Sequence, residues 1–356
     1  AEAYSRAAEL FNEEYAYFSS FSTEWLEHSK RYVEDMTVRF RLGSSSTVVE
    51  VAANDGYLLQ YVKEKSIGCY GIEPTASTAN AARQKGIEIV QDFLSTSLAQ
   101  QLRSQGKTAD LVVANNVLAH VPDINDFSNA CRLLMKPNGV FTCEFPHLMN
   151  LISQHQFDTI YHEHYSYLSA TSVARLGKMH GLNLFRVEQL KIHGGSNRYW
   201  LKKLDLDINT ESSVEKIIHL ENQSGLFNPQ EWDQFSSKVS KILADFLEWL
   251  RDDQVSERRI FGYGAAAKAS TLLNSTEIAP NLVKAIADLS LEKQRRFMPP
   301  HGIRIISPEE LFLEKPTDVI IFPWNKKCAF CWYCHSFIYV YFVYNFKCIR
   351  RYLKYN

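Results

Sequence analysis

Apolar residues recur with a helical spacing over the first forty residues. Two runs, AAELFNEEYAYF and STEWLEHSKRYVEDMTVRF, place apolar side chains three or four positions apart, which predicts two helices. Ser22 or Thr23 is expected to cap the start of the second helix, because a side-chain oxygen at that position accepts a free backbone N–H. The chain is therefore predicted to begin with a helical segment, residues 1–40.

From residue 41 the pattern changes to short β-branched runs separated by amphipathic stretches. Strands are predicted at 46–52, 69–73, 87–93, 109–117 and 139–145, with helices from Tyr57, over 75–86 and over 124–139. Strands that alternate with helices at this spacing are typical of a parallel, doubly wound sheet. Residues 41–205 are therefore predicted to form one Rossmann-like α/β domain.

The second half repeats this organisation on a smaller scale. Two long helices are expected over 212–252, and they form a helical bridge whose limits we set at 206–256. RRIFGYGAAAKASTLLN (258–274) then predicts a strand, a glycine-rich turn and a helix, and VKAIADLS predicts a second strand with Asp288 at its end. Residues 257–327 are therefore predicted to be a second, smaller Rossmann-like α/β domain.

Residues 328–356 differ in composition from the rest of the chain. They contain eleven aromatic residues and four of the seven cysteines, without Asp, Glu, Gly or Pro. The spacing of Cys328, Cys331 and Cys334 resembles an iron–sulfur run, but such ligands sit on turns, for which this segment lacks the residues. The apolar span 328–346 is marginally long enough for a membrane anchor. We favour a third interpretation, in which the tail is foreign to the fold.

Charge and composition narrow the classes of partner. The 356 residues include 39 Lys and Arg against 40 Asp and Glu, so no basic field is available to hold nucleic acid or a lipid surface. The start AEAYSRAAELFNEEY lacks the basic and apolar regions of a signal peptide. Cys69, Cys131 and Cys143 each lie in an apolar run or helix, which is typical of reduced thiols. We expect a cytoplasmic protein with no nucleic-acid or membrane partner.

Polar residues gather where the strands of the first α/β domain end, and ligands of such sheets bind there. Glu73 is placed to accept two hydrogen bonds from a ribose diol. The first loop holds Asn54 and Asp55 instead of G-x-G-x-x-G, and an aspartate would repel the pyrophosphate of a dinucleotide. S-adenosylmethionine fits better, and ordinary strand-end turns are the alternative. The candidate cofactor-binding residues are Glu50, Ala52, Asn54, Asp55, Gly56, Glu73, Asp92, Phe93 and Asn115.

Several segments together resemble the S-adenosylmethionine-dependent sugar C-methyltransferases. They are VVEVAANDGYLLQYV, YGIEPT, DLVVANNVLAHVPDINDF, EFPHLMNLI, QFDTIYHEHYSYLS, IHGGSNRYWL and GYGAAAKASTLLN, within residues 8–325. The resemblance implies a class I methyltransferase sheet and methyl transfer to C3 of a nucleotide-activated 4-keto-6-deoxyhexose. Members of this family usually begin with a small zinc-binding module of cysteine pairs, which the sequence from Ala1 onward does not show, so we expect no metal.

C-methylation requires a carbon nucleophile, so a base must remove a proton from a carbon next to a ketone. The segment Tyr161–Tyr165 groups two imidazoles, a carboxylate and two phenols. We predict His164 as the base, because an imidazole is half-ionised near working pH. Glu163 is expected to orient or polarise the site, and Tyr161 to donate to the developing oxyanion. A metal site at the His-x-His pair is the alternative, but no third ligand at a suitable spacing supports it.

The resemblance adds residues from outside that segment. It implies that His120 and Asn116, after the fourth strand, face the sugar, and that Tyr15 or Tyr17 does so from the leading helix. His120 is therefore the alternative base, and the sequence alone does not separate the two histidines.

The glycine-rich turn of the second domain has two functional interpretations. Gly262-x-Gly264-x-x-Ala267, with Asp288 at the spacing of a ribose-binding carboxylate, would indicate an NAD(P)-dependent oxidoreductase. We favour a different ligand: the loop amides at Gly264, the helix dipole and Lys268 are expected to hold the diphosphate of an NDP-4-keto-deoxysugar. A purely structural turn is a third alternative. The oligomeric state, monomer or dimer, stays open.

Overall fold

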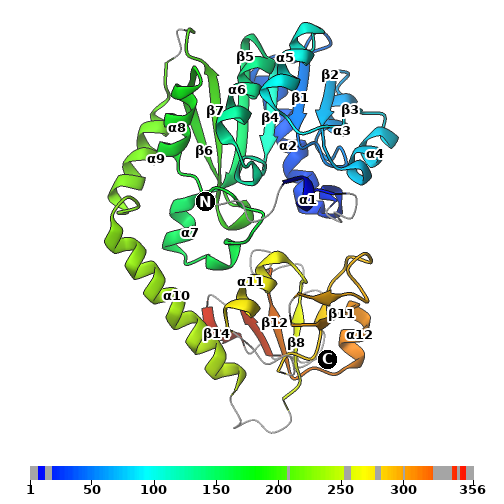
Figure 1. Ribbon diagram of the computed structural model, residues 1–356, viewed down its shortest axis with the longest axis vertical. Coiled ribbons are helices and arrows are strands. Elements are labelled where there is room, and N and C mark those ends of the chain that lie inside the picture. Colours follow the sequence, from blue (N-terminus) through cyan, green and yellow to red (C-terminus); the bar gives the residue numbers. More distant parts are fainter. Residues whose placement is uncertain are drawn as a thin grey trace, which may run out of the picture. The chain divides into compact units, whose positions relative to one another are not determined.

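The structure is a computed structural model of the 356-residue chain (Figure 1). It describes residues 7–12, 18–206, 209–251, 258–276, 282–299, 301–323, 339–342 and 345–349. The chain divides into two compact units. The first consists of residues 1–149, 162–191 and 195–225, and the second of residues 150–161, 192–194 and 226–356. Each unit contains one seven-stranded sheet.

The sheet of the first unit has the strand order β3-β2-β1-β4-β5-β7-β6. Its strands are β1 Thr47–Val51, β2 Gly68–Ile72, β3 Glu88–Val90, β4 Ala109–Asn115, β5 Met135–Pro146, β6 Leu182–Leu190 and β7 Ser196–Lys203. The first five strands run parallel, and β7 pairs antiparallel with both β5 and β6. The predicted α/β class with a parallel-rich sheet is therefore confirmed.

The helices α3 Leu59–Glu64, α4 Ala76–Gln84, α5 Thr96–Ser104 and α6 Ile124–Leu134 connect the parallel strands, and the sequence pattern predicted α3, α4 and α6. The helices α1 Ala7–Leu10 and α2 Thr23–Arg39 precede β1, α8 Ala170–Met179 lies between β5 and β6, and α9 Ser212–Gln223 follows β7. The predicted cap of α2 is confirmed, because Ser22 Oγ accepts the N–H of Trp25 at 3.3 Å. The helix α7 (Leu148–Ser153) lies where the chain passes from the first unit to the second.

The helix predicted over 124–139 ends earlier, at Leu134, and β5 starts with the next residue. Pro137 lacks the N–H of a helical residue and would clash with the preceding turn. Gly139 lies against the backbone of β4, where a Cβ would stand 2.8 Å from the carbonyl oxygen of Ala109. Close pairing with β4 therefore replaces the last turns of the expected helix.

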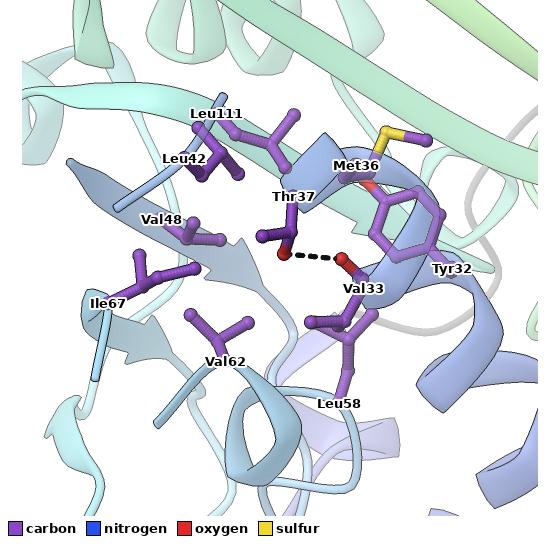
Figure 2. Close-up of a pocket in the computed structure, with 10 residues that line it drawn as sticks. All are labelled: Tyr32, Val33, Met36, Thr37, Leu42, Val48, Leu58, Val62, Ile67 and Leu111. Carbon is purple, nitrogen blue, oxygen red and sulfur yellow. Dashed lines mark hydrogen bonds between the residues drawn. The ribbon is translucent and has the colours of Figure 1, made fainter. Parts of the chain in front are cut away.

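Alternate residues of each strand face two different helical layers. Val49 and Val112 belong to the main core, which α5, α6 and α8 cover, whereas Val48 and Leu111 face α2 and α3. Figure 2 shows a small apolar cavity on this second side, lined also by Met36 of α2. Its free volume of ≈ 10 Å³ is about that of a single water molecule. The cavity is a gap in the packing and not a ligand site.

The second unit has the sheet order β10-β11-β9-β8-β12-β13-β14. Its strands are β8 Ile260–Tyr263, β9 Ile286–Ala287, β10 Phe297–Met298, β11 Ile303–Ile306, β12 Asp318–Ile321, β13 Tyr339–Phe342 and β14 Asn345–Ile349, and its helices are α10 Pro229–Leu250, α11 Ala267–Ser275 and α12 Pro308–Leu313. The five inner strands are parallel, and β10 and β14 are antiparallel edge strands. A core of Phe246, Leu272 and Ile320 joins α10, α11 and β12. The predicted second, smaller α/β domain is confirmed.

The strands β13 and β14 come from the tail that the sequence analysis interpreted as foreign to the fold. The backbone of Tyr339–Phe342 pairs in parallel with β12, and Asn345–Ile349 pairs antiparallel with β13. The described part of the tail therefore continues the second sheet. Cys328, Cys331 and Cys334 lie outside the described residues. Within the described parts of the chain, no helix is long and apolar enough to cross a membrane.

Candidate functional site

The chain leaves β1 through a turn that contains three left-handed residues. Ala52, Asn54 and Gly56 have φ angles of 53°, 49° and 75°, a region that residues other than glycine rarely adopt. Gly56 is needed for a second reason, since a Cβ there would collide with Ile87 and lie in tight contact with Ala82. Its small size therefore lets α4 and the chain before β3 pack against the turn.

Glu73, directly after the neighbouring strand β2, stabilises this turn through a hydrogen bond. Its Oε2 accepts the N–H of Asn54 at 2.8 Å, and its Oε1 accepts the N–H of Thr75 at 2.9 Å. Burial raises the pKa of the Glu73 carboxyl, and these hydrogen bonds oppose the shift. The side chains of Thr75 and Thr78 also lie close enough to lower the pKa of this carboxyl. The carboxylate is thus held in a fixed orientation beside the first loop.

The side chains of Asn54 and Asp55 bind the protein's own N-terminal segment. Asn54 Oδ1 accepts the N–H of Ser19 at 2.9 Å, and Asp55 Oδ2 accepts the N–H of Ser20 at 3.3 Å. Lys85 Nζ lies 3.4 Å from Asp55 Oδ2 and compensates its charge. These contacts fasten the chain before α2 to the first loop, so Asp55 is not the free negative charge that its place in the sequence suggests.

The remaining predicted residues lie on other segments of the chain. Asp92 and Phe93 are exposed beyond β3, where Asp92 Oδ1 accepts the N–H of Phe93 at 2.7 Å. Tyr161 belongs to the second unit. Tyr15 and Tyr17 lie outside the described residues.

Two buried polar side chains occupy the ends of β1 and β4. Asn115 is 5% exposed, and neither its Oδ1 nor its Nδ2 makes a hydrogen bond to a described residue. Glu50 is fully buried, which raises the pKa of its carboxyl well above the ordinary value, and the Tyr57 hydroxyl opposes this shift. A buried polar group without a partner costs ~1–3 kcal/mol. The residues present therefore fit a polar cofactor at this edge of the sheet, one that supplies the missing partners of Asn115.

A buried ionic network, which the sequence analysis did not identify, supports the same edge. Paired positions on β4, β5 and β7 carry Asn115, Glu144 and Arg198. Arg198 donates to Glu144 Oε2 from Nε at 3.0 Å and from Nη2 at 2.7 Å, and His28 Nε2 of α2 lies 2.9 Å from Oε1. Burial alone would raise the pKa of Glu144, but Arg198 and His28 lower it. The signal in the sequence is a charged residue beside apolar ones, since Glu144 stands between Cys143 and Phe145, and Arg198 directly precedes the run YWL.

His120 and His164 come from different segments and meet beside the end of β4. His120 ends a short 3₁₀ helix (Leu118–His120), and its Nδ1 lies 3.0 Å from the carbonyl oxygen of Glu163. Because a carbonyl only accepts, Nδ1 carries the proton and Nε2 presents a lone pair. Burial lowers the pKa of His120 to about 4, so this imidazole is neutral at physiological pH. The His164 ring lies edge-on to it, with the ring centroids 4.7 Å apart.

Backbone hydrogen bonds hold the segment 162–168 against the 3₁₀ helix. The N–H groups of Tyr165 and Ser166 both donate to the carbonyl of Ala119, at 2.7 and 3.2 Å. Together with the bond between His120 and Glu163, they fix the segment on both sides of His164. In the described parts of the chain, no group of three or more His, Cys, Asp or Glu is arranged to hold a metal ion.

Phe11, just after α1, contacts both His120 and the segment that follows β2. Its ring meets His120 edge-on at a centroid distance of 6.0 Å, and its carbonyl accepts the hydroxyl of Thr75 at 3.3 Å. Asn116 directly follows β4 with a φ of 54°, and its N–H donates to the Glu144 carbonyl at 2.6 Å. The first loop, Glu73 and the two histidines therefore share the carboxyl edge of one sheet.

The glycine-rich turn of the second unit lies between β8 and α11. Gly264 has a φ of 89°, and a Cβ there would stand 2.5 Å from Cδ of Pro323, so only glycine fits. Lys268 is the second residue of α11 and is half-buried. Both predicted residues thus belong to the start of this helix.

Asp288, after β9, is part of the same turn. Its Oδ2 accepts the N–H of Ala265 at 2.7 Å, and its Oδ1 accepts the N–H of Ser290 at 2.9 Å. Lys293 donates to the carbonyl of Ala265 at 3.0 Å and lies 3.8 Å from Asp288 Oδ2. The carboxylate therefore occupies a loop amide that a pyrophosphate would need.

Two family models match the chain, one in each half. Residues 25–187 match a methyltransferase domain, and residues 191–332 match a C-methyltransferase C-terminal domain. The C-methyltransferase NovU of Streptomyces niveus is 27% identical over 311 residues, which make up 87% of this chain and 74% of that protein.

Solved structures that are similar cover about half of the chain. Magnesium protoporphyrin IX methyltransferase of Synechocystis PCC 6803, with bound SAH, is 14% identical with a TM-score of 0.41, over 49% of this chain and 82% of that one. An S-adenosylmethionine-dependent methyltransferase of Clostridium acetobutylicum is 11% identical with a TM-score of 0.40, over 50% and 92%. From the two family models and the curated relative, we conclude that the chain belongs to the S-adenosylmethionine-dependent C-methyltransferases.

Proposed function

We propose that the enzyme methylates C3 of a nucleotide-activated 4-keto-6-deoxyhexose through an enolate that a protein base generates. The observation that carries this proposal is the pair of imidazoles, His120 and His164, at the carboxyl edge of the methyltransferase sheet. Removal of a proton from a carbon next to a ketone needs a positioned base. The segments that resemble sugar C-methyltransferases, QFDTIYHEHYSYLS among them, favour a sugar as the ketone substrate.

S-adenosylmethionine supplies an electrophilic methyl group when it is bound. We assign its ribose to Glu73, whose carboxylate two backbone N–H groups hold in place. Its remaining polar groups are assigned to Glu50 and Asn115, because the buried amide of Asn115 has hydrogen-bonding capacity that a ligand would satisfy. The other proposed contacts are Ala52, Asn54, Asp55 and Gly56 in the first loop, and Asp92 and Phe93 beyond β3.

His164 is our proposed base. A base works best when its pKa lies near the operating pH, whereas burial lowers the pKa of His120 to about 4. In this scheme the His164 imidazole takes the C3 proton, and the electron pair of the C–H bond forms the enolate. The hydroxyl of Tyr161 donates a hydrogen bond to the enolate oxygen. Glu163 holds His120 through its carbonyl, and the free lone pair at Nε2 of His120 accepts a hydroxyl of the sugar.

We assign the diphosphate of the substrate to the second unit, at the start of α11. The dipole of α11 and the charge of Lys268 favour an anion there. Asp288 already accepts the amide of Ala265, so the loop itself contributes less than the sequence suggested. The same contact weakens the oxidoreductase alternative, which needs this amide for a pyrophosphate and Asp288 for a ribose. Asn116, and Tyr15 or Tyr17, are proposed to complete the sugar site.

The direct test is to incubate the enzyme with S-adenosylmethionine and a 4-keto-6-deoxy sugar nucleotide. We expect the mass of the sugar nucleotide to increase by one methylene. Methylation only of an oxygen or nitrogen acceptor would overturn the proposal. Because Cys69, Cys131 and Cys143 are free and mostly buried, we also propose that the enzyme works in a reducing compartment, the cytoplasm.

His164→Ala separates the base from the cofactor site. We expect the variant to lose the exchange of the C3 proton into heavy water, while its affinity for S-adenosylhomocysteine stays unchanged. His219→Ala, at an exposed position of α9, is the matched control and should exchange like the wild type. Full exchange in His164→Ala together with loss of exchange in His120→Ala would assign the base to His120 instead.

A further inference from the structure

We infer that Glu221 is a positioning residue for the segment 162–168, and this inference rests on the proposed function, because that segment carries the proposed base. Glu221 lies on α9, and its carboxylate is fully buried. Within the sequence it is one of two acidic residues on an amphipathic helix. Its role follows only from the contacts that it makes.

Four donors surround the carboxylate of Glu221. Oε1 accepts the N–H of Ala170 at 2.5 Å and Nε2 of His147 at 2.6 Å. Oε2 accepts the N–H and the hydroxyl of Thr171 at 2.9 and 2.6 Å. Burial alone would raise the pKa of Glu221, but these hydrogen bonds lower it, so the group is ionised. An anion at the free N–H groups of a helix N-terminus is also favoured by the helix dipole.

These donors come from two parts of the chain, the start of α8 and the residue that follows β5. Ala170 starts α8 two residues after Leu168, at the end of the segment, and His147 directly follows β5. The N–H of Leu148 donates to the carbonyl of Leu168 at 3.1 Å. The same two segments are therefore also joined by a backbone hydrogen bond. Glu221 thus fixes the end of the segment to the end of a central strand.

The other side of the segment is fixed to the 3₁₀ helix that holds His120. Tyr165 and Ser166 both donate to the carbonyl of Ala119, and the carbonyl of Glu163 accepts from His120. His164 therefore lies between two anchors, of which Glu221 is the one that depends on a single ionised side chain. Displacement of a catalytic group by about 1 Å costs roughly 10²-fold in rate. Loss of this anchor should therefore slow catalysis more than it weakens cofactor binding.

Glu221→Gln is the test, because it keeps the size of the side chain but turns one acceptor into a donor that faces N–H groups. We expect kcat for methyl transfer to fall ~10–100-fold, while the dissociation constant of S-adenosylhomocysteine changes less than about twofold. Glu215→Gln, at an exposed position of the same helix, is the matched control and should leave both quantities unchanged. Thr171→Val removes one of the four donors and should give an intermediate loss of kcat, which keeps the test available if Glu221→Gln does not fold.

Hydrogen exchange gives a readout that needs no turnover. In Glu221→Gln the amides of 162–171 should exchange faster than in the wild type, while those of β1 and β2 should not. Faster exchange throughout the first unit, with kcat and cofactor affinity reduced in parallel, would show a merely structural role and overturn the inference. An unchanged kcat in a folded Glu221→Gln variant would also overturn it. If the wild type methylates no sugar nucleotide, the proposed function fails, and the exchange pattern still decides whether Glu221 anchors the segment.

Discussion

Arg198→Met tests the account of the buried network beneath the carboxyl edge. Arg198 and Glu144 are 4% and 0% exposed, and two hydrogen bonds join them. Removal of one partner of a buried ion pair leaves the other charge uncompensated and costs ~3–5 kcal/mol. We expect the free energy of unfolding of the first unit to fall by about this amount at neutral pH, although the methionine fills most of the volume of the arginine stem.

The loss should depend on pH in a defined direction. The folded-state pKa of Glu144 lies below its ordinary value, so its charge stabilises the wild type above the unfolded pKa, and this contribution is lost as the pH falls through the folded-state pKa. Without Arg198, burial dominates and the pKa of Glu144 should rise above its ordinary value. Protonation of Glu144 then removes the uncompensated buried charge from the variant. The difference in unfolding free energy between wild type and variant should therefore narrow as the pH falls towards about 5.

Denaturant unfolding followed by tryptophan fluorescence measures this gap, because Trp25 and Trp200 report on the first unit, whereas Trp232 and Trp249 of α10 report on the second. Arg259→Met is the control: Arg259 pairs with Glu314 at 2.8 Å, but both side chains are 45% exposed, and an exposed pair contributes ~0–1 kcal/mol. A loss below about 1 kcal/mol in Arg198→Met, or a gap that does not change with pH, would refute the reasoning.

Three further variants probe other parts of the chain. Glu50→Gln should stabilise the first unit by ~1–3 kcal/mol at neutral pH, because burial raises the pKa of Glu50 and makes its ionised form unfavourable in the folded state. Calorimetry should show that the same variant binds S-adenosylhomocysteine more weakly. Met36→Ala should cost ~2–5 kcal/mol in thermal unfolding, because it enlarges the cavity of Figure 2, whereas a neutral effect would show that α2 collapses into the space. Gly264→Ala should destabilise the second unit by ~1–3 kcal/mol in denaturant titration, since its φ is 89° and its Cβ would contact Pro323, and an unchanged midpoint would contradict that geometry.

Most elements of the fold could be predicted from the sequence, because hydrophobic periodicity is a local property. The β-branched runs gave the parallel strands, Ser22 gave the start of α2, and the position of Glu73 after β2 followed from the strand end. The helix predicted over 124–139 was too long for a local reason as well. The helical spacing of the preceding residues was extended past Pro137 and Gly139, both of which disfavour a helix.

The chemistry of the site depended on strand order and register, which no local pattern encodes. The sequence alone determined that polar groups such as Glu73 and Asn115 lie at strand ends, and that His120 and His164 are candidate bases. Only the tertiary structure decided that His120 bonds to Glu163, 43 residues away, and that Glu144 meets Arg198 and His28 at separations of 54 and 116 residues. It likewise decided that Asp55 and Asp288 bind the protein's own backbone, which leaves them less free for a ligand than their sequence positions suggest. The physical reason is that a side chain's partners, and through them its charge and orientation, are set by the segments that packing brings beside it.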